Sequence, residues 1–495
     1  MPAKKRPSNK SLKILYACSE LAPLVTSGGL GDVASALPRA LHAQGHDVRV
    51  AIPCYRSIPP EHRGDQYCLC MADLGAKTQW GALRISTVPG SSIPLYLIEH
   101  DGYFGREHPY GHGAYEYEDN AERYCFLCLA LLHAIPQTHW RPDIVHCHDW
   151  HTAPIPAYIK TRLAHTEAWR GMPSLFTIHN LAYQGRYKAR FLENTGFSWD
   201  LFTPDCLEFH GDINLMKAGI AFATKINTVS PRYAQEILTP EFGEGLDGFL
   251  RTRRNSLHGI LNGVDYTQWD PVSDPHIAAH YSALDLSGKA VCKRALQDEL
   301  GLPPRNAPLF GMVSRLYWQK GLDLLVNAIP AMLQEDVQIV ILGTGDPYYV
   351  EPLRRIEAAH PAHMRVLVKF DSALSHRIEA GSDFFLMPSH YEPCGLSQLY
   401  SLRYGTIPIV RETGGLADSV VPLAPSNIKK GKATGIVFQP KTPEAFLHAF
   451  RQAIELYRQP SVLNAVRLAG MKQDFSWERS SKAYVELYRE AIARP

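Results

Sequence analysis

The sequence lacks an excess of charge of either sign, and it lacks a long apolar run at its start. Its 495 residues contain 51 Lys and Arg against 49 Asp and Glu, so the formal net charge is only +2. The basic start MPAKKRPSNKSLK precedes an apolar segment that is too short for a signal peptide core or a membrane span. We therefore expect no nucleic-acid partner and no membrane partner, and a disordered basic tail at residues 1–11.

The ten cysteines lack the paired spacing of a disulfide framework. Scattered thiols fit a reducing compartment, so the sequence predicts a cytoplasmic protein. One C-x-x-C occurs at Cys125 and Cys128, but no second pair follows it, and it lies in the apolar helical run YCFLCLALLHAI. Packing in the core is the favoured interpretation for this pair, ahead of a redox or metal role.

Repeats of the solenoid or propeller kind are also missing, and what is present instead is alternation of apolar strands with helical patterns. This alternation predicts an α/β fold with parallel sheets. After residues 12–20, the segments expected as buried strands are 47–53, 94–100, 143–149, 173–180 and 225–230, and then 308–314, 337–343, 365–370, 384–389 and 407–412.

The pattern restarts after GILNGVDYTQWDPVSDPH, which predicts two doubly wound, Rossmann-like domains facing each other across a cleft. We expect the first domain at 12–265, the second at 266–475, and a final amphipathic helix at 476–495 that crosses back to the first. An internal echo supports two similar halves, because SGGLGDV at 27–33 recurs as TGGLADSV at 413–420.

The first glycine loop matches G-x-G-x-x-A from Gly29 to Ala34, which raises a dinucleotide-binding domain as an alternative. About ten residues separate the loop from its strand, and the second strand ends in Ala-Ile-Pro-Cys rather than in an acid, so NAD is disfavoured. The remaining interpretations are backbone N–H groups that approach a phosphate substrate at a helix N-terminus, or a glycine turn without a ligand.

Two cations follow a strand in the second half, Arg315 and Lys320 in MVSRLYWQKGLDLL. An Arg fork and a Lys point charge on one loop can clamp a diphosphate, although most such pairs are surface charges. Further on, Glu392 precedes Cys394-Gly395-Leu396, whose amides begin a helix. The chain has no D-x-D triplet, so we expect no bound metal, and the two cations would neutralise the leaving group.

Polar residues follow two strands of the first half. The segment VHCHDWHTA carries three His residues and Asp149, and FTIHNLAYQG carries His179 and Asn180. A zinc site is one interpretation of the first segment. A polar strand end at a substrate site is favoured, because ligands bind at the carboxyl ends of strands in open α/β sheets.

These segments together resemble glycosyltransferase family 5, the bacterial glycogen synthases and plant starch synthases, over about residues 12–490. The resemblance is carried by SGGLGDV, YEDNAERY, HCHDWHTA, FTIHNLAYQG, LMKAGIAFATKINTVSP, GILNGVD, SRLYWQKGLDLL, EPCGLSQLYSLRYGTIPIVRETGGLADSV and DFSWERSSKAY. It implies the GT-B fold and transfer of glucose, with retention of the α configuration, from ADP-glucose to the non-reducing 4-hydroxyl of an α-1,4-glucan.

The resemblance also implies roles for particular residues. Arg315 and Lys320 would neutralise the departing diphosphate and Glu392 would orient glucose hydroxyls. The His179 carbonyl would lie near the reacting carbon. The other expected site residues are Asp149 and Asn262 in the glucose pocket, Gly28 and Gly29 in the glycine loop, and the backbone amides of Cys394, Gly395 and Leu396.

Two departures from the family pattern stand out. Thr26 occupies the position of the lysine in K-x-G-G-L, which removes a contact to the donor. The second member of E-x7-E is Tyr400, and no carboxylate stands out as a nucleophile, which implies a front-face route in which the diphosphate accepts the proton. The alternatives are a catalytically weakened glucan-binding or scaffold protein and a relative that uses UDP-glucose.

Overall fold

The computed structural model describes residues 10–112 and 115–493 and divides the chain into two compact units. Unit 1 contains residues 10–229, Ala234–Gly263 and the C-terminal residues from Trp477, and unit 2 contains Ser230–Tyr233 and Val264–Ser476. Most of the expected tail lies outside the described residues. Its last residue, Ser11, is described, and its hydroxyl donates to the Gly45 carbonyl at 2.6 Å.

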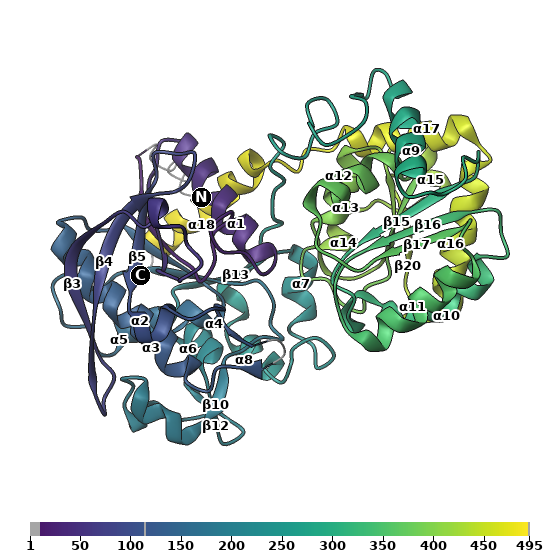
Figure 1. The fold of residues 1–495 in the computed structure, drawn as a ribbon. Coiled ribbons are helices and arrows are strands. Elements are labelled where there is room, and N and C mark those ends of the chain that lie inside the picture. Colours follow the sequence, from purple (N-terminus) through teal and green to yellow (C-terminus); the bar gives the residue numbers. More distant parts are fainter. Residues whose placement is uncertain (1–9, 113–114, 494–495) are drawn as a thin grey trace, which may run out of the picture. The chain divides into compact units, whose positions relative to one another are not determined.

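A nine-stranded sheet forms the centre of unit 1 (Figure 1). Its seven parallel strands run in the order 3-2-1-4-5-6-7 by chain position, which is doubly wound, and an antiparallel pair extends one edge. Across the sheet the strands are β14 (Leu257–Gly259), β13 (Lys225–Thr228), β9 (Ser174–Ile178), β8 (Ile144–His148), β1 (Lys13–Ala17), β2 (Asp47–Pro53), β5 (Pro94–Glu99), β4 (Thr78–Thr87) and β3 (Asp65–Asp73).

Helices cover both faces of this sheet, and every residue of its central strands β8 and β9 is buried. The last helix of the chain belongs here: α18 packs on α1 and on β8 and β9. The α-helices of unit 1 are α1 (Gly29–Ala43), α2 (Asp101–Phe104), α3 (Asn120–Ala134), α4 (Asp149–Thr152), α5 (Pro154–Lys160), α6 (Leu215–Phe222), α8 (Asp247–Thr252) and α18 (Trp477–Ala493), while α7 (Pro231–Glu236) begins in unit 2 and ends in unit 1.

Unit 2 is built on a six-stranded parallel sheet whose order is 3-2-1-4-5-6 by chain position, the doubly wound order of dinucleotide-binding folds. The strands are β17 (Met364–Leu367), β16 (Gln338–Leu342), β15 (Leu309–Val313), β18 (Phe384–Met387), β19 (Ile407–Arg411) and β20 (Ile436–Phe438). The helices are α9 (Ser287–Glu299), α10 (Leu322–Met332), α11 (Pro347–Ala359), α12 (Ser372–Gly381), α13 (Ser397–Arg403), α14 (Gly414–Ser419), α15 (Pro425–Lys429), α16 (Pro443–Tyr457) and α17 (Pro460–Met471).

The side chains of these strands alternate between two cores. Phe310 and Met312 of β15 join the larger core with residues of α10, α11, α16 and α17, whereas Leu309 joins the smaller core with residues of α9, α12 and α14. Both cores are apolar, and the polar candidate site residues of unit 2 lie after the strand ends.

Shorter elements complete the fold. They are the strands β6 (Gly111–His112) and β7 (Tyr115–Glu116), a small sheet of β10 (Arg186–Lys188), β12 (Asp212–Asn214) and β11 (Glu208–Phe209), and the 3-10 turns Pro60–His62, Ile135–Thr138, Ala189–Asn194, Trp199–Leu201, Arg254–Ser256 and Trp318–Lys320.

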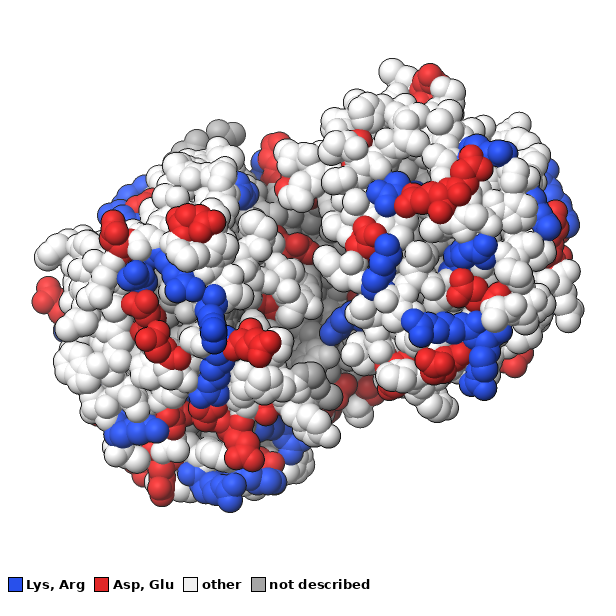
Figure 2. Space-filling view, viewed as in Figure 1, with Lys and Arg blue, Asp and Glu red and all other residues white. Residues whose placement is uncertain are grey.

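The surface carries charges of both signs. On the face drawn in Figure 2, Lys and Arg atoms alternate with Asp and Glu atoms over each unit. This mixture agrees with the small net charge of the sequence. Within residues 10–112 and 115–493, no helix is both long enough and apolar enough to cross a bilayer.

Candidate active site

Each parallel sheet has one point where the strand order reverses, and ligands of doubly wound folds bind outside the carboxyl ends of the strands at that point. In unit 2 the reversal lies between β15 and β18, and in unit 1 between β1 and β8. Most of the residues expected from the sequence follow these four strands: Arg315 and Lys320 follow β15, Glu392 to Leu396 follow β18, Gly28 and Gly29 follow β1, and Asp149 follows β8. His179 follows β9, the neighbour of β8, and Asn262 follows the edge strand β14.

An ion pair occupies the reversal point of unit 2. Lys320 Nζ lies 2.6 Å from Glu392 Oε2, and the Ser389 hydroxyl donates to the same oxygen at 3.0 Å. Glu392 is buried, so the ammonium group and the hydroxyl together stabilise its charge. The structure thus brings two expected site residues from separate loops into direct contact.

Arg315 differs from Lys320 because its side chain is exposed. Within the described part of the chain, its guanidinium group makes no hydrogen bond or ion pair, whereas its carbonyl accepts from Tyr317 N–H at 3.0 Å. A cation that no protein acid neutralises is available to an anionic ligand.

The loop from Glu392 to Leu396 is held by the second glycine motif. Gly415 N–H donates to the Glu392 and Pro393 carbonyls at 3.1 and 3.2 Å. A Cβ on Gly414 would lie 1.9 Å from the Glu392 carbonyl oxygen, so this approach requires glycine. The Gln398 amide donates to the Cys394 and Gly395 carbonyls, both at 3.0 Å, and Leu396 caps α13.

The first glycine motif has a different environment. Gly28 is exposed and extended at the start of α1, and a Cβ placed on it would meet nothing within 4 Å. Gly29 is exposed and is the first residue of the helix. The two copies of the echo therefore start helices in both units, and the glycines Gly414 and Gly415 of the second copy stand directly against the backbone of the 392–394 loop.

Glu20 fixes the start of the first glycine loop, a contact that sequence reasoning missed. The N–H and hydroxyl groups of Ser27 both donate to the Glu20 carboxylate, and the Tyr110 hydroxyl donates to it at 2.7 Å. Glu20 is buried and Tyr110 is 90 residues away in sequence. The available signal was an acid directly after an apolar strand, a position where a buried carboxylate needs partners.

Thr26, which stands at the family lysine position, is exposed. Arg186 and Lys188, in the segment QGRYKARF, are cations of unit 1 that could replace the missing charge. They pair instead with Asp212 in the small sheet, at 3.6 and 3.2 Å. Their charge is partly neutralised there, so the structure gives no support to a replacement role.

Asp149 has a strained backbone and a perturbed carboxyl group. Its φ is +54°, a conformation that residues other than glycine adopt rarely. The His179 N–H donates to its Oδ1 at 2.7 Å. Burial raises the pKa of Asp149 to about 7, although the N–H groups of His179 and Asn180 oppose this increase. Asp149 thus positions the backbone of His179.

Three histidine rings lie together on one face of the unit 1 sheet. His146 and His148 have ring centroids 3.9 Å apart, and His148 Nδ1 lies 2.9 Å from His179 Nε2. His146 contacts the Tyr488 hydroxyl of α18 at 2.8 Å and the Thr177 hydroxyl at 2.7 Å. Desolvation lowers the pKa of His146 and His148 well below 6.5 and that of His179 to about 3, so all three are neutral at pH 7.

Asn262 is buried after β14, and its Oδ1 has no hydrogen-bond partner within the described residues. A buried amide oxygen without a partner is costly in a folded protein, which makes it a candidate acceptor for a ligand hydroxyl.

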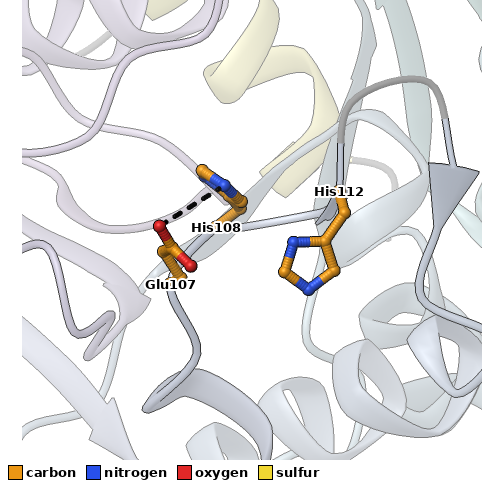
Figure 3. A group of neighbouring side chains, drawn as sticks. All are labelled: Glu107, His108 and His112. Carbon is orange, nitrogen blue, oxygen red and sulfur yellow. Dashed lines mark ion pairs between the residues drawn. The ribbon is translucent and has the colours of Figure 1, made fainter.

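One group of side chains within residues 10–112 and 115–493 has metal-ligand spacing, formed by Glu107, His108 and His112 (Figure 3). Their ligand atoms lie within 4.8 Å of one another, but all three side chains are exposed. The histidines of VHCHDWHTA form no such group. Cys125 and Cys128 are free and fully buried in α3, which confirms core packing for the C-x-x-C pair.

Family models match both units of the chain. Residues 13–252 match the starch synthase catalytic domain, and residues 295–465 match the glycosyl transferases group 1 domain. A solved structure of the catalytic domain of starch synthase IV from Arabidopsis thaliana, bound to ADP and acarbose, is 35% identical. It has a TM-score of 0.89 over 98% of this chain and 100% of that chain.

Curated relatives match over nearly the whole length. The glycogen synthase of Anaeromyxobacter sp. (strain Fw109-5) is 47% identical over 97% of this chain and 100% of the relative. The glycogen synthase of Moorella thermoacetica is 43% identical over 98% of both chains. Together with the two Rossmann-like sheets, these matches show that the chain belongs to the glycogen and starch synthase family, glycosyltransferases of GT-B fold.

Proposed function

We propose that this enzyme transfers glucose from ADP-glucose to the 4-hydroxyl at the non-reducing end of an α-1,4-glucan and retains the α configuration. The observation that carries the proposal is the reversal point of unit 2, where exposed Arg315 accompanies the buried Lys320–Glu392 pair. Relatives named glycogen synthase and the starch synthase solved with ADP and acarbose support the choice of donor and acceptor.

In this proposal unit 2 binds the diphosphate. The Arg315 guanidinium and the Lys320 ammonium stabilise the negative charge that develops as the glycosidic bond to the diphosphate breaks. The amides of Cys394, Gly395 and Leu396 add donors at the same loop. Glu392 accepts from glucose hydroxyls, and Lys320 at 2.6 Å orients its carboxylate.

Unit 1 handles the sugar in this proposal. Asp149 holds the His179 backbone so that its carbonyl lies beside the reacting carbon, where positive charge develops. Asn262 offers its Oδ1, which has no partner among the described residues, to a hydroxyl, and Gly28 leaves room at the start of α1, where Gly29 follows. The departing diphosphate accepts the proton of the attacking hydroxyl on the same face, so no enzyme nucleophile is needed.

The test is transfer of labelled glucose to a maltooligosaccharide from ADP-glucose and, in parallel, from UDP-glucose. We expect labelled glucan from ADP-glucose, with new α-1,4 linkages by NMR, and the same rate in EDTA. Labelling from UDP-glucose alone would identify the related transferase. Glucan binding without any labelling would identify a scaffold protein, the alternative that Thr26 favours.

The free state of all ten cysteines, none of which pairs in the structure, fits the reducing conditions of the cytoplasm, which we propose as the site of action.

A further inference from the structure

The hydrogen bond between His148 and His179 requires a definite arrangement of protons. Both rings are neutral, because desolvation depresses their pKa values, and a neutral imidazole has one N–H donor and one acceptor nitrogen. In the contact between His148 Nδ1 and His179 Nε2, one nitrogen must carry the proton and the other must accept it. Two arrangements of the pair are therefore open.

The second nitrogen of His148 decides between them. His148 is fully buried, and its Nε2 has no hydrogen-bond partner within the described residues. A buried N–H without an acceptor is rarer in folded proteins than a buried acceptor without a donor. His148 therefore carries its proton on Nδ1 and donates it to His179 Nε2.

The surroundings of His148 leave its ring little freedom. The Tyr16 ring lies 4.1 Å from it and the His146 ring 3.9 Å, measured between centroids. Its backbone N–H donates to the Thr152 hydroxyl at 2.7 Å. The His179 side chain is less enclosed, because part of it is exposed. The restrained His148 ring can therefore determine which nitrogen of His179 carries the proton.

We propose that His148 is a positioning residue that fixes His179 as the Nδ1–H tautomer, with its ring set as a hydrogen-bond donor toward the substrate. His148 and Asp149 then divide the work at the end of β8: Asp149 holds the His179 backbone at 2.7 Å and His148 holds its ring at 2.9 Å. The consequence for turnover rests on the proposed function, but the tautomer itself does not.

Three substitutions of His148 separate the effect of its hydrogen-bond donor from the effect of its side-chain size. In His148→Asn, the side-chain amide nitrogen replaces Nδ1 as a donor. His148→Gln places its amide nearer to the position of Nε2, and His148→Leu has no donor. The exposed histidine His133, whose Nδ1 contacts Gln137 on the surface, gives the control variant His133→Asn.

The experiment is nitrogen-15 NMR of the full chain with labelled histidine, together with initial rates of glucan labelling. We expect the wild-type His179 signals to show a protonated Nδ1 and a bare Nε2, unchanged from pH 8 to pH 5. In His148→Leu this pattern is lost and kcat falls, roughly 10-fold to 100-fold as for other partners that orient a functional histidine. His148→Asn recovers the pattern and most of kcat, and His133→Asn changes neither.

A protonated Nε2 on wild-type His179 would overturn the proposal, and so would a wild-type pattern in a folded His148→Leu protein. The NMR result stands even where neither sugar nucleotide is a donor, so failure of the proposed function is recognised separately. Thermal unfolding of each variant identifies any loss of fold. If His148→Leu does not fold, His148→Asn is compared with wild type, because it retains the donor.

Discussion

At the residue scale, the two cations expected to clamp a diphosphate are not equivalent. Lys320 is already paired with buried Glu392, whereas Arg315 is exposed and its guanidinium group is unpaired within the described residues. Removing Lys320 leaves a buried charge without its partner, and removing Arg315 leaves nothing uncompensated. This difference separates an effect on stability from an effect on catalysis.

We expect Arg315→Ala to lower kcat on the order of 10²–10³ with an unchanged unfolding midpoint. Lys320→Ala should lower kcat similarly and also destabilise the protein by about 1–3 kcal/mol. Glucan labelling and denaturant unfolding measure both effects, and exposed Arg294, changed to Ala, is the control. Equal stability of the Lys320 and Arg315 variants would contradict the structural role of the ion pair.

Asp149 predicts a particular dependence of stability on pH. Its pKa is about 7 in the folded protein against an ordinary value of 3.8, so between these values the folded state binds more protons than the unfolded state. This difference in bound protons lowers the free energy of unfolding as pH rises from 4 to 7. Asp149→Asn removes this pH-dependent contribution because Asn does not titrate, and Asn tolerates the positive φ.

The variant should therefore gain stability relative to wild type as pH rises across this range, and the two proteins should be most alike at pH 4. Unfolding midpoints measured from pH 4 to pH 8 test this. A difference that does not change with pH would show that Asp149 is ionised at neutral pH.

Thr26 gives a prediction about the donor. If this exposed position faces the phosphates of the donor, a lysine there adds a charge-assisted contact, roughly 1.5–3 kcal/mol, because threonine offers only a short hydroxyl group. Thr26→Lys should lower the KM for ADP-glucose, or raise kcat where the contact forms mainly in the transition state. Thr26→Met controls for length, and a lower kcat/KM in the lysine variant would show a pocket adapted to threonine.

At the scale of elements, the two glycine motifs provide a matched pair. Gly414 has φ +43° and stands against the Glu392 carbonyl, whereas Gly28 is extended in open space. Gly414→Ala should cost at least about 1–2 kcal/mol of stability from its φ alone. Gly28→Ala should leave stability unchanged and raise the KM for the donor. An unchanged KM would remove Gly28 from the proposed site.

The buried parallel strands could be predicted from the sequence, because strands covered on both faces are continuous apolar runs; the expected strand at 47–53 is β2 (Asp47–Pro53). The β3–β4 hairpin was not predicted, since its strands mix exposed and buried residues without a clear period. The strands β10 to β12 are two or three residues long, too short for a pattern to show.

The strand-end positions of Asp149 and His179 were predictable, because both residues stand in recognisable segments directly after apolar strands. Contacts between residues far apart in sequence were not predictable. Tyr110 contacts Glu20 across 90 positions, and Lys320 contacts Glu392 across 72 positions. Only the folded chain brings such pairs together, and no local spacing encodes them.

At the scale of the whole molecule, the chain leaves unit 1 after Gly263 and returns to it at Trp477. The returning helix supplies hydroxyl groups to the unit 1 sheet: Tyr488 contacts His146 at 2.8 Å, and Tyr484 accepts from the Asn227 amide at 3.1 Å. These are buried polar contacts, so α18 does more than cover apolar surface.

Tyr488→Phe should destabilise unit 1 by about 1–3 kcal/mol, because one nitrogen of buried His146 loses its partner. Hydrogen exchange of the β8 and β9 amides measures the change, and amides of the unit 2 sheet in the same sample are an internal reference. Tyr348→Phe, at an exposed tyrosine, is the control. Equal acceleration of exchange in both units would contradict a local role.

The return of α18 also sets the order in which the molecule is completed during synthesis. A ribosome delivers residues 477–493 after every residue of unit 2 has been made. The second unit can therefore finish folding while the first still lacks the tyrosines that pair with His146 and Asn227. In this chain the amino-terminal unit is begun first and finished last, and a chain truncated before Trp477 retains the cations of unit 2 without a completed histidine cluster in unit 1.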